Sequence, residues 1–165
     1  MAEGVSFKVK FDDADARRAI RTLALKAASL REPLSDIGEA LLTSTHERFR
    51  QEVSPEGKPW KALTPRYVNR PRKRGGRGGR AHPILFRRGN LFRSLIYQAS
   101  DTELRLGTNQ KFPGGASAGA IHQFGGKSNM APGPAAIPAR PFLGISTDDE
   151  KTIGSILADY LALQS

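Results

Sequence analysis

The sequence predicts an α+β protein with a small antiparallel sheet packed with three main helices and two long loops, one of them Arg/Gly-rich. Two observations predict the sheet: apolar residues alternate near the N-terminus, and two strand-like runs flank a short turn in the middle of the chain. A third observation predicts the helices, because three other segments carry apolar residues at helical spacing. With 165 residues, the chain is expected to form a single domain, residues 1–165.

The first part of the chain predicts one strand and two helices. Apolar residues alternate with polar ones, as in a strand with one buried face, at Val5, Phe7, Val9 and Phe11. Asp12 and Asp13 can cap a following helix. The apolar stripe of that helix comprises Ile20, Leu23, Ala24, Ala27 and Leu30. A second helix is expected after Pro33, with a stripe of Leu34, Ile37, Leu41, Leu42, Thr45 and Phe49.

The remainder begins with a long break in the pattern, from Val53 to Pro83, with at most one helical turn around residues 64–68. Such long irregular connections tend to be functional or disordered. Order resumes with a helical turn in RRGNLFRSL, and the runs SLIYQAS and ELRLGT predict a hairpin around Asp101 and Thr102. ASAGAIHQF predicts a short helix, and GGKSNMAPGPAAIPARP predicts a loop. Thr147 or Asp148 is expected to cap a final amphipathic helix.

Composition argues against several classes of site. The chain has no cysteine, which removes Cys-based zinc sites and nucleophiles and suits a reducing cytoplasm. No secretory signal is visible and no apolar run reaches the ~18 residues of a membrane span, so we expect a soluble protein without membrane contact. His46, His82 and His122 are far apart in the sequence, and we predict no metal site, no cofactor and no catalytic residue. GGKS at residues 125–128 lacks the first glycine of a phosphate-binding loop, because Ile121 occupies that position.

The positive charge is confined to one segment. Residues 57–100 contain twelve Lys or Arg and no acidic residue, whereas the other 121 residues sum to −2. Within this segment, NRPRKRGGRGGR marks a flexible basic arm at about residues 66–82, with Arg70, Arg72, Lys73, Arg74, Arg77 and Arg80. Arg/Gly tracts can follow a phosphate backbone without sequence preference, but this one lacks the aromatic residues that stack on bases. The arm is therefore expected to contact DNA nonspecifically, to bind an acidic partner, or to remain solvated.

Three further stretches carry a family resemblance: SPEGKPWKAL at Ser54–Leu63, ILFRRGNLFRSL at Ile84–Leu95, and AIHQFGG with IPARPFLGIS within Ala120–Ser146. In this order, and with the closing helix, the chain resembles the phage virion morphogenesis family. These are the tail-completion or head–tail joining proteins of tailed bacteriophages and prophages. The resemblance runs from about the second predicted helix to the C-terminus. The Arg/Gly tract stands where the family usually has a modest linker, so no family role carries over to residues 70–80.

The resemblance implies a structural protein that is not an enzyme and needs no cofactor. It would complete the head-proximal end of the tail, as part of a neck ring around the DNA path, and so enable head–tail joining. The expected partners are further copies of the chain, tail-tube, tail-terminator or head-connector proteins, and viral DNA without sequence preference. Assembly would take place in the host cytoplasm and the protein would reside in the virion neck. The alternative function is a nonspecific nucleic-acid-binding protein that acts through the basic arm.

Four residues in these stretches are candidates for a subunit interface: Trp60, Arg140, Phe142 and Leu143. Trp60 can anchor its loop by burying a large apolar surface after a turn that Gly57 permits. Arg140 lies between two prolines and is expected to form an ion pair, within the fold or across a subunit boundary. Phe142 and Leu143 are expected to dock into the domain or into a neighbouring subunit.

Overall fold

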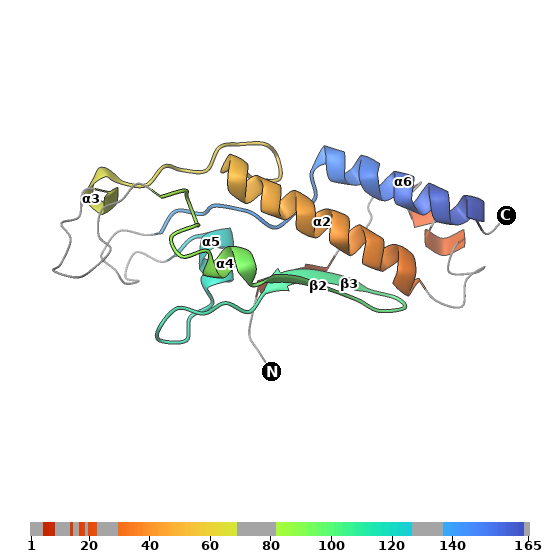
Figure 1. The fold of residues 1–165 in the computed structure, drawn as a ribbon, viewed down its shortest axis with the longest axis horizontal. Helices are drawn as coiled ribbons and strands as arrows, with labels where there is room; N and C mark the ends of the chain where they lie inside the picture. Colours follow the sequence, from red (N-terminus) through yellow and green to blue (C-terminus); the bar gives the residue numbers. More distant parts are fainter. Residues whose placement is uncertain are drawn as a thin grey trace.

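The fold is a three-stranded antiparallel sheet covered on one face by a long helix, α2, with helix α6 packed on α2 (Figure 1). The computed structural model describes residues 5–8, 14, 17–18, 20–22, 30–68, 82–126 and 137–163. Helices and strands share one hydrophobic core. The α+β class predicted from the sequence is confirmed.

The sheet consists of β1 (Val5–Lys8), β2 (Leu95–Ala99) and β3 (Leu104–Thr108), in the order β1-β3-β2. Thr108 of β3 pairs with both Val5 and Leu95, and Leu106 pairs with Tyr97. Because side chains alternate across a sheet, these residues face the same side, where α2 packs. The predicted hairpin is confirmed, as is the part of the first predicted strand that lies within the described residues.

Helix α2 (Arg31–Gln51) presents its predicted apolar stripe to the core, where Ile37, Leu41 and Phe49 are at most 1% exposed. It begins two residues before Pro33, although the sequence predicted that it would follow this proline. Amides in the first turn have no acceptor within the helix, so a proline there sacrifices no hydrogen bond. Helix α6 (Thr147–Leu163) packs along α2 and buries Ile153 and Leu157.

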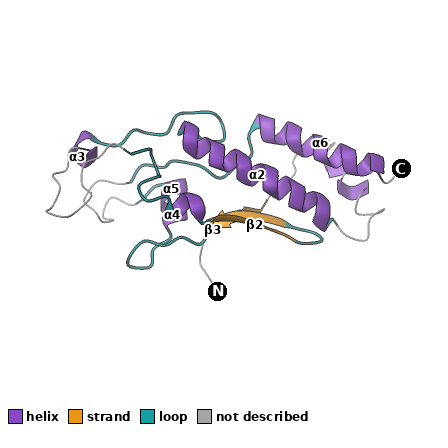
Figure 2. Ribbon diagram, in the orientation of Figure 1, coloured by secondary structure: helices purple, strands orange, loops and turns teal. Residues whose placement is uncertain are grey.

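Three short helices complete the described elements: α3 (Pro65–Val68), α4 (Asn90–Arg93) and α5 (Ala118–Phe124). They confirm the helical turns and the short helix predicted from the sequence. Of the first predicted helix, residues 14, 17–18 and 20–22 are helical, and its other residues lie outside the described part. Long loops extend from the helices and sheet toward α3 (Figure 2). Among the helices that the structure describes, none is both long enough and apolar enough to cross a lipid bilayer.

Gly38 allows α2 to approach the sheet closely. A β-carbon at this position would lie 2.4 Å from Cδ2 of Tyr97. We expect Gly38→Ala to lower the free energy of unfolding by about 1–3 kcal/mol in urea denaturation, because overpacking displaces neighbouring groups. Gly154→Ala in α6 is the matched control: its β-carbon would meet nothing within 4 Å. That variant is expected to gain about 0.5–1 kcal/mol from helix propensity, and equal effects of the two would contradict the prediction.

Candidate functional site

The Trp60 loop (Ser54–Leu63) folds back on the C-terminal end of α2. Glu52 ends the helix in a left-handed conformation, with φ 58°, and its carbonyl accepts a hydrogen bond from the Trp60 amide at 2.7 Å. The turn between them places Gly57 at φ 74°, a conformation that glycine adopts without steric cost. The turn expected at Gly57 is therefore present, and it returns the chain to α2 at Trp60.

The indole of Trp60 joins this loop to a second part of the chain. The residue is 6% exposed, and its ring lies edge-on to Phe49 with centroids 5.4 Å apart. Phe49 in turn contacts Phe142 edge-on at 5.2 Å. The indole Nε1 donates to the carbonyl of Pro141 at 2.7 Å, which satisfies the polar group of an otherwise apolar side chain. Packing and hydrogen bonding thus act together on the same contact.

Arg140 makes the reciprocal contact from the Arg140 segment (Ile137–Ser146). Its Nε donates to the carbonyl of Lys61 at 2.8 Å, and its Nη2 donates to that of Ala62 at 3.4 Å. Burial lowers the pKa of the guanidinium, while the charge of Glu52 favours the protonated form. Within the described residues, the guanidinium is thus held by loop carbonyls, where the sequence predicted an ion pair. The reason is local: the Trp60 loop turns these carbonyls inward, and they need donors.

Gln123, at the end of α5, fixes the Arg140 segment from the other side. Its Oε1 accepts from the amides of Phe142 and Leu143, both at 3.0 Å, and its Nε2 donates to the carbonyl of Leu143 at 2.9 Å. The side chain therefore satisfies backbone groups much as a neighbouring strand would. Sequence reasoning missed this residue, although it lies in the AIHQFGG stretch. A glutamine in a short helix carries no local sign that its amide is engaged.

A buried ion pair joins α2, the Arg140 segment and α6. Arg48 donates from Nη2 to the carboxylate of Asp149, and both side chains are 6% exposed. Its Nη1 donates to the carbonyls of Phe142 at 3.2 Å and Gly144 at 2.9 Å. Burial lowers the pKa of Arg48, and the attraction of Asp149 opposes that shift. Sequence reasoning missed the pair because both residues lie beside other charged residues that are exposed.

Ser146 caps α6, and the prediction that Thr147 or Asp148 does so is wrong. The Oγ of Ser146 accepts from the Asp149 amide at 3.2 Å, and its carbonyl accepts from the Glu150 amide at 3.0 Å. The carboxylate of Asp149 accepts in return from the amide of Ser146 at 2.7 Å. This reciprocal arrangement is a capping box. The signal in the sequence was the spacing of three residues between Ser146 and Asp149, which is typical of a capping box. In such a box the side chain of Asp149 turns back toward the start of the helix.

We call the Trp60 loop and the Arg140 segment together the clamp. The four predicted interface residues lie in these two segments. In the single chain each of them is at most 6% exposed: Trp60, Arg140, Phe142 and Leu143. Their participation in a subunit contact stays a prediction. The six residues of the predicted basic arm lie outside the described residues: Arg70, Arg72, Lys73, Arg74, Arg77 and Arg80.

Part of the basic segment does lie within the described residues and flanks the clamp. The amide of Ile84 donates to Oε1 of Glu52 at 2.6 Å, which brings the stretch before α4 to the same end of α2 as the Trp60 loop. Four cations on these two stretches have exposed side chains, and we call them the basic end: Lys58, Lys61, Arg87 and Arg88. The Trp60 loop also carries the exposed Glu56, so four exposed cations and one exposed carboxylate give this end a net charge of +3 independently of the arm.

His122 of α5 contacts the Arg140 segment, and its carbonyl accepts a hydrogen bond from the Arg140 amide at 2.6 Å. Burial and the charge of Arg140 lower the pKa of His122 to about 4. Its Nδ1 has no hydrogen-bond partner in the described part of the chain, and its ring lies edge-on to Phe112 at 5.6 Å. Across the described residues, no three His, Asp or Glu side chains gather as a metal site would require. The imidazole is therefore a neutral packing group at pH 7.

This depressed pKa predicts a pH dependence of stability. An unfolded histidine has a pKa near 6.5, so the unfolded chain takes up the proton first as the pH falls. The free energy of unfolding is expected to decrease by roughly 3 kcal/mol between about pH 6.5 and pH 4 from this group alone. Urea denaturation of the wild type and of His122→Gln at both pH values measures the contribution. An equal loss in both proteins would show that other groups cause it.

Comparison with known proteins finds relatives for most of the chain. The profile of the phage virion morphogenesis family matches residues 11–162, which include both halves of the clamp. Over 115 residues the chain is 33% identical to the "Putative capsid assembly protein G" of Escherichia phage Mu, across 69% of this chain and 68% of that protein. It is 39% identical over 74 residues to the "Mu-like prophage FluMu G protein 2" of Haemophilus influenzae, across 45% and 49% of the two chains. No solved structure matches the chain.

Proposed function

Since the chain belongs to the phage virion morphogenesis family and serves phage assembly, we propose that it completes the head-proximal end of a tail and enables the tail to join a DNA-filled head. The observation that carries this proposal is the extent of the family match, which includes both halves of the clamp and the helices that support them. The role is structural and uses no cofactor.

The clamp supports a structural role through its rigidity. Aromatic packing, the Arg140 contacts and the buried ion pair hold the Trp60 loop and the Arg140 segment against each other and against α2 and α6. A joining protein has to present a fixed surface to two large assemblies, because each contact surface that must first become ordered weakens binding. The clamp is thus suited to positioning, because its own contacts fix the Trp60 loop and the Arg140 segment against α2.

The proposed location is the virion neck, where copies of the chain form a ring around the DNA path after assembly in the host cytoplasm. The neighbours would be further copies, together with tail-tube, tail-terminator or head-connector proteins. The basic segment, residues 57–100 with a charge of +12, would face either DNA phosphates in the lumen or an acidic protein surface.

Electron microscopy of lysates tests the role directly. A phage with this gene disabled is expected to yield separate DNA-filled heads and tails, and adding the purified protein is expected to restore joined particles. Lysate that receives buffer alone is the control. Normal joined particles without the protein would overturn the proposal, and an absence of tails would move the role to an earlier stage of tail assembly.

The second candidate, a nonspecific DNA-binding protein, is favoured by the same concentration of positive charge. Binding of a labelled duplex should then fall by orders of magnitude between about 50 and 200 mM salt, because counterions are released from each neutralised phosphate. Deletion of residues 70–80 separates the two functions. A DNA-binding protein would lose its affinity for the duplex, whereas a joining protein would keep its fold and its activity in the lysate assay.

A further inference from the structure

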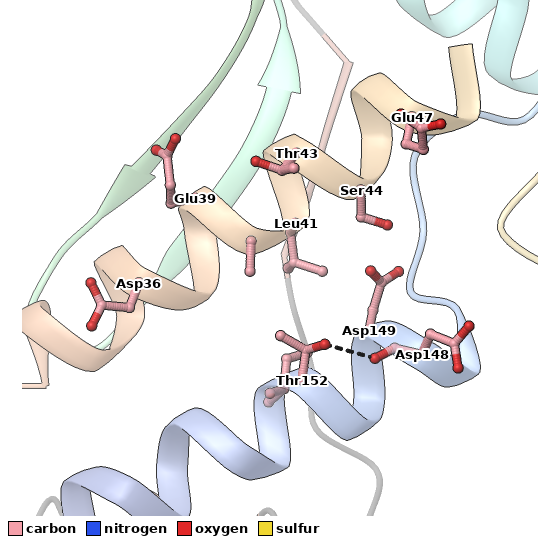
Figure 3. A pocket seen from close by; sticks show the side chains of 11 residues that line it. Asp36, Glu39, Leu41, Thr43, Ser44, Glu47, Asp148, Asp149 and Thr152 are labelled. Atoms are coloured by element: carbon pink, nitrogen blue, oxygen red, sulfur yellow. Dashed lines mark hydrogen bonds between the residues drawn. The ribbon is translucent and has the colours of Figure 1, made fainter. Parts of the chain in front are cut away.

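A groove of about 710 Å³ runs between α2 and α6 (Figure 3). Leu41 and Ile153, both nearly fully buried, form part of its apolar lining. Figure 3 shows Ser44 of α2 and Thr152 of α6 on the two helices that bound it. The groove is therefore an indentation with a floor of buried apolar residues and walls of small, more exposed side chains such as Ser44 and Thr152, and its volume can receive side chains from another molecule.

Carboxylates surround this apolar lining. Four acidic residues that line the groove have exposed side chains: Asp36, Glu39, Glu47 and Asp148. Glu47 and Asp148 contact Arg50 and Lys151, but these pairs lie on the surface, where ion pairs are weak and readily exchanged.

The charge of the two helices is opposite to that of the basic segment. Together α2 and α6 contain eight acidic and four basic residues, a net charge of −4. Residues 57–100 carry +12. The charges of Arg48 and Asp149 cancel in the buried pair, so the negative excess lies on the exposed surface of the helices.

The two charged surfaces occupy successive parts of α2: the groove lining extends from Asp36 to Glu47, and the basic end lies on the loops beyond Gln51. The Trp60 loop leads from one end of α2 toward α3, whereas α6 runs alongside α2 to the opposite end of the long axis (Figure 1). Each is fixed to α2 by its own contacts: the basic end through Trp60 and Glu52, and the groove through the packing of α6 on α2. Two copies can bring them together, since the basic end of one can reach the groove of the next. A contact between two different surfaces repeats from copy to copy and closes into a ring when the rotation allows.

We propose that the α2–α6 groove binds the basic end of a second copy of this chain, and that this head-to-tail contact builds the ring; the inference rests on the proposed function. The carboxylates attract the cations of the neighbour, and the aliphatic stems of its Lys and Arg side chains lie against Ala40 and the methyl groups of Thr43 and Thr152. The occupant is the neighbour's basic end because the chain itself carries the matching charge. Such complementarity sets the register and the rate of association.

Two complementary charge-reversal variants test the contact. The groove variant carries Glu39→Lys with Glu47→Lys, and the basic-end variant carries Lys61→Glu with Arg87→Glu. Sedimentation velocity without DNA is expected to show oligomers for the wild type and at least a tenfold weaker self-association for either variant. Mixed in equal amounts, the two variants should assemble again, because each reversed surface now matches the other. The control variant carries Glu150→Lys with Asp159→Lys, two positions of α6 outside the groove lining. It changes the net charge of the protein as much as the groove variant does, and it should assemble like the wild type.

Each other outcome overturns the contact. A monomeric wild type, or a groove variant that assembles normally, shows that the groove is not the interface. If the groove variant fails to assemble but the basic-end variant assembles normally, a surface other than the basic end occupies the groove. Failure of the mixture to assemble shows that the two surfaces do not meet. The lysate assay tests the proposed function separately. If the mixed variants assemble but the wild type does not join heads to tails, the contact is retained and the proposed function is rejected.

Discussion

Asp149→Ala is expected to lower the free energy of unfolding by about 3–5 kcal/mol, because it leaves the buried guanidinium of Arg48 without its counter-charge. The substitution also removes the acceptor for the amide and the hydroxyl of Ser146, which opens the capping box of α6. Urea denaturation measures the effect, and Trp60 provides the signal because it is the single tryptophan of the chain.

Asp148→Ala is the matched control for this variant. Asp148 is the preceding residue in α6, but its side chain is exposed and pairs with Lys151 at the surface. Its removal should leave the stability nearly unchanged. The double variant Arg48→Met with Asp149→Leu should recover the part of the loss that comes from the unpaired charge, because both partners become apolar. The capping box stays open in this variant, and the carbonyls of Phe142 and Gly144 lose their donor. Equal effects of Asp149→Ala and Asp148→Ala would show that the pair does not hold α6 to α2.

Trp60→Ala is expected to cost about 3–5 kcal/mol, the usual range for truncating a buried aromatic side chain. The variant loses the edge-on contact with Phe49 and leaves the carbonyl of Pro141 without its indole donor. Circular dichroism during urea denaturation measures the loss. The lysate assay, at a temperature where the variant is folded, then tests whether a loosened clamp still supports joining.

Trp60→Phe separates the contribution of ring packing from that of the indole hydrogen bond. A phenyl ring keeps much of the packing against Phe49 but cannot donate to Pro141, so the expected loss is smaller, about 1–3 kcal/mol. Lys58→Ala, an exposed position in the same loop, should change stability little. A Trp60→Ala variant as stable as Lys58→Ala would mean that the indole does not anchor the loop.

The elements that the sequence predicted are those whose signal is local. The stripe of α2 and the hairpin of β2 and β3 follow from the spacing of apolar residues, and both are present. Spacing determines them because one buried face repeats every 3.6 residues in a helix and every two in a strand. The start of α2 and the cap of α6 were less well predicted, since caps depend on single side chains near Pro33 and Ser146.

The candidate site was predicted only in part. The motif stretches pointed to Trp60, Arg140, Phe142 and Leu143, and the structure brings them together. The residues that fix these stretches, Gln123 among them, carry no comparable signal. Their partners are backbone groups whose position depends on how the loops fold.

By itself, the sequence determined the α+β class, most of the helices and strands, and the confinement of the positive charge to one segment. Only the tertiary structure decided which charges are buried and which are free to meet another molecule. Arg48 and Asp149 are 101 residues apart and resemble the exposed charges beside them. A charge can be buried only where folding supplies its partner, and no local pattern records that encounter. The same packing of α6 on α2 leaves four exposed carboxylates around an open groove: Asp36, Glu39, Glu47 and Asp148.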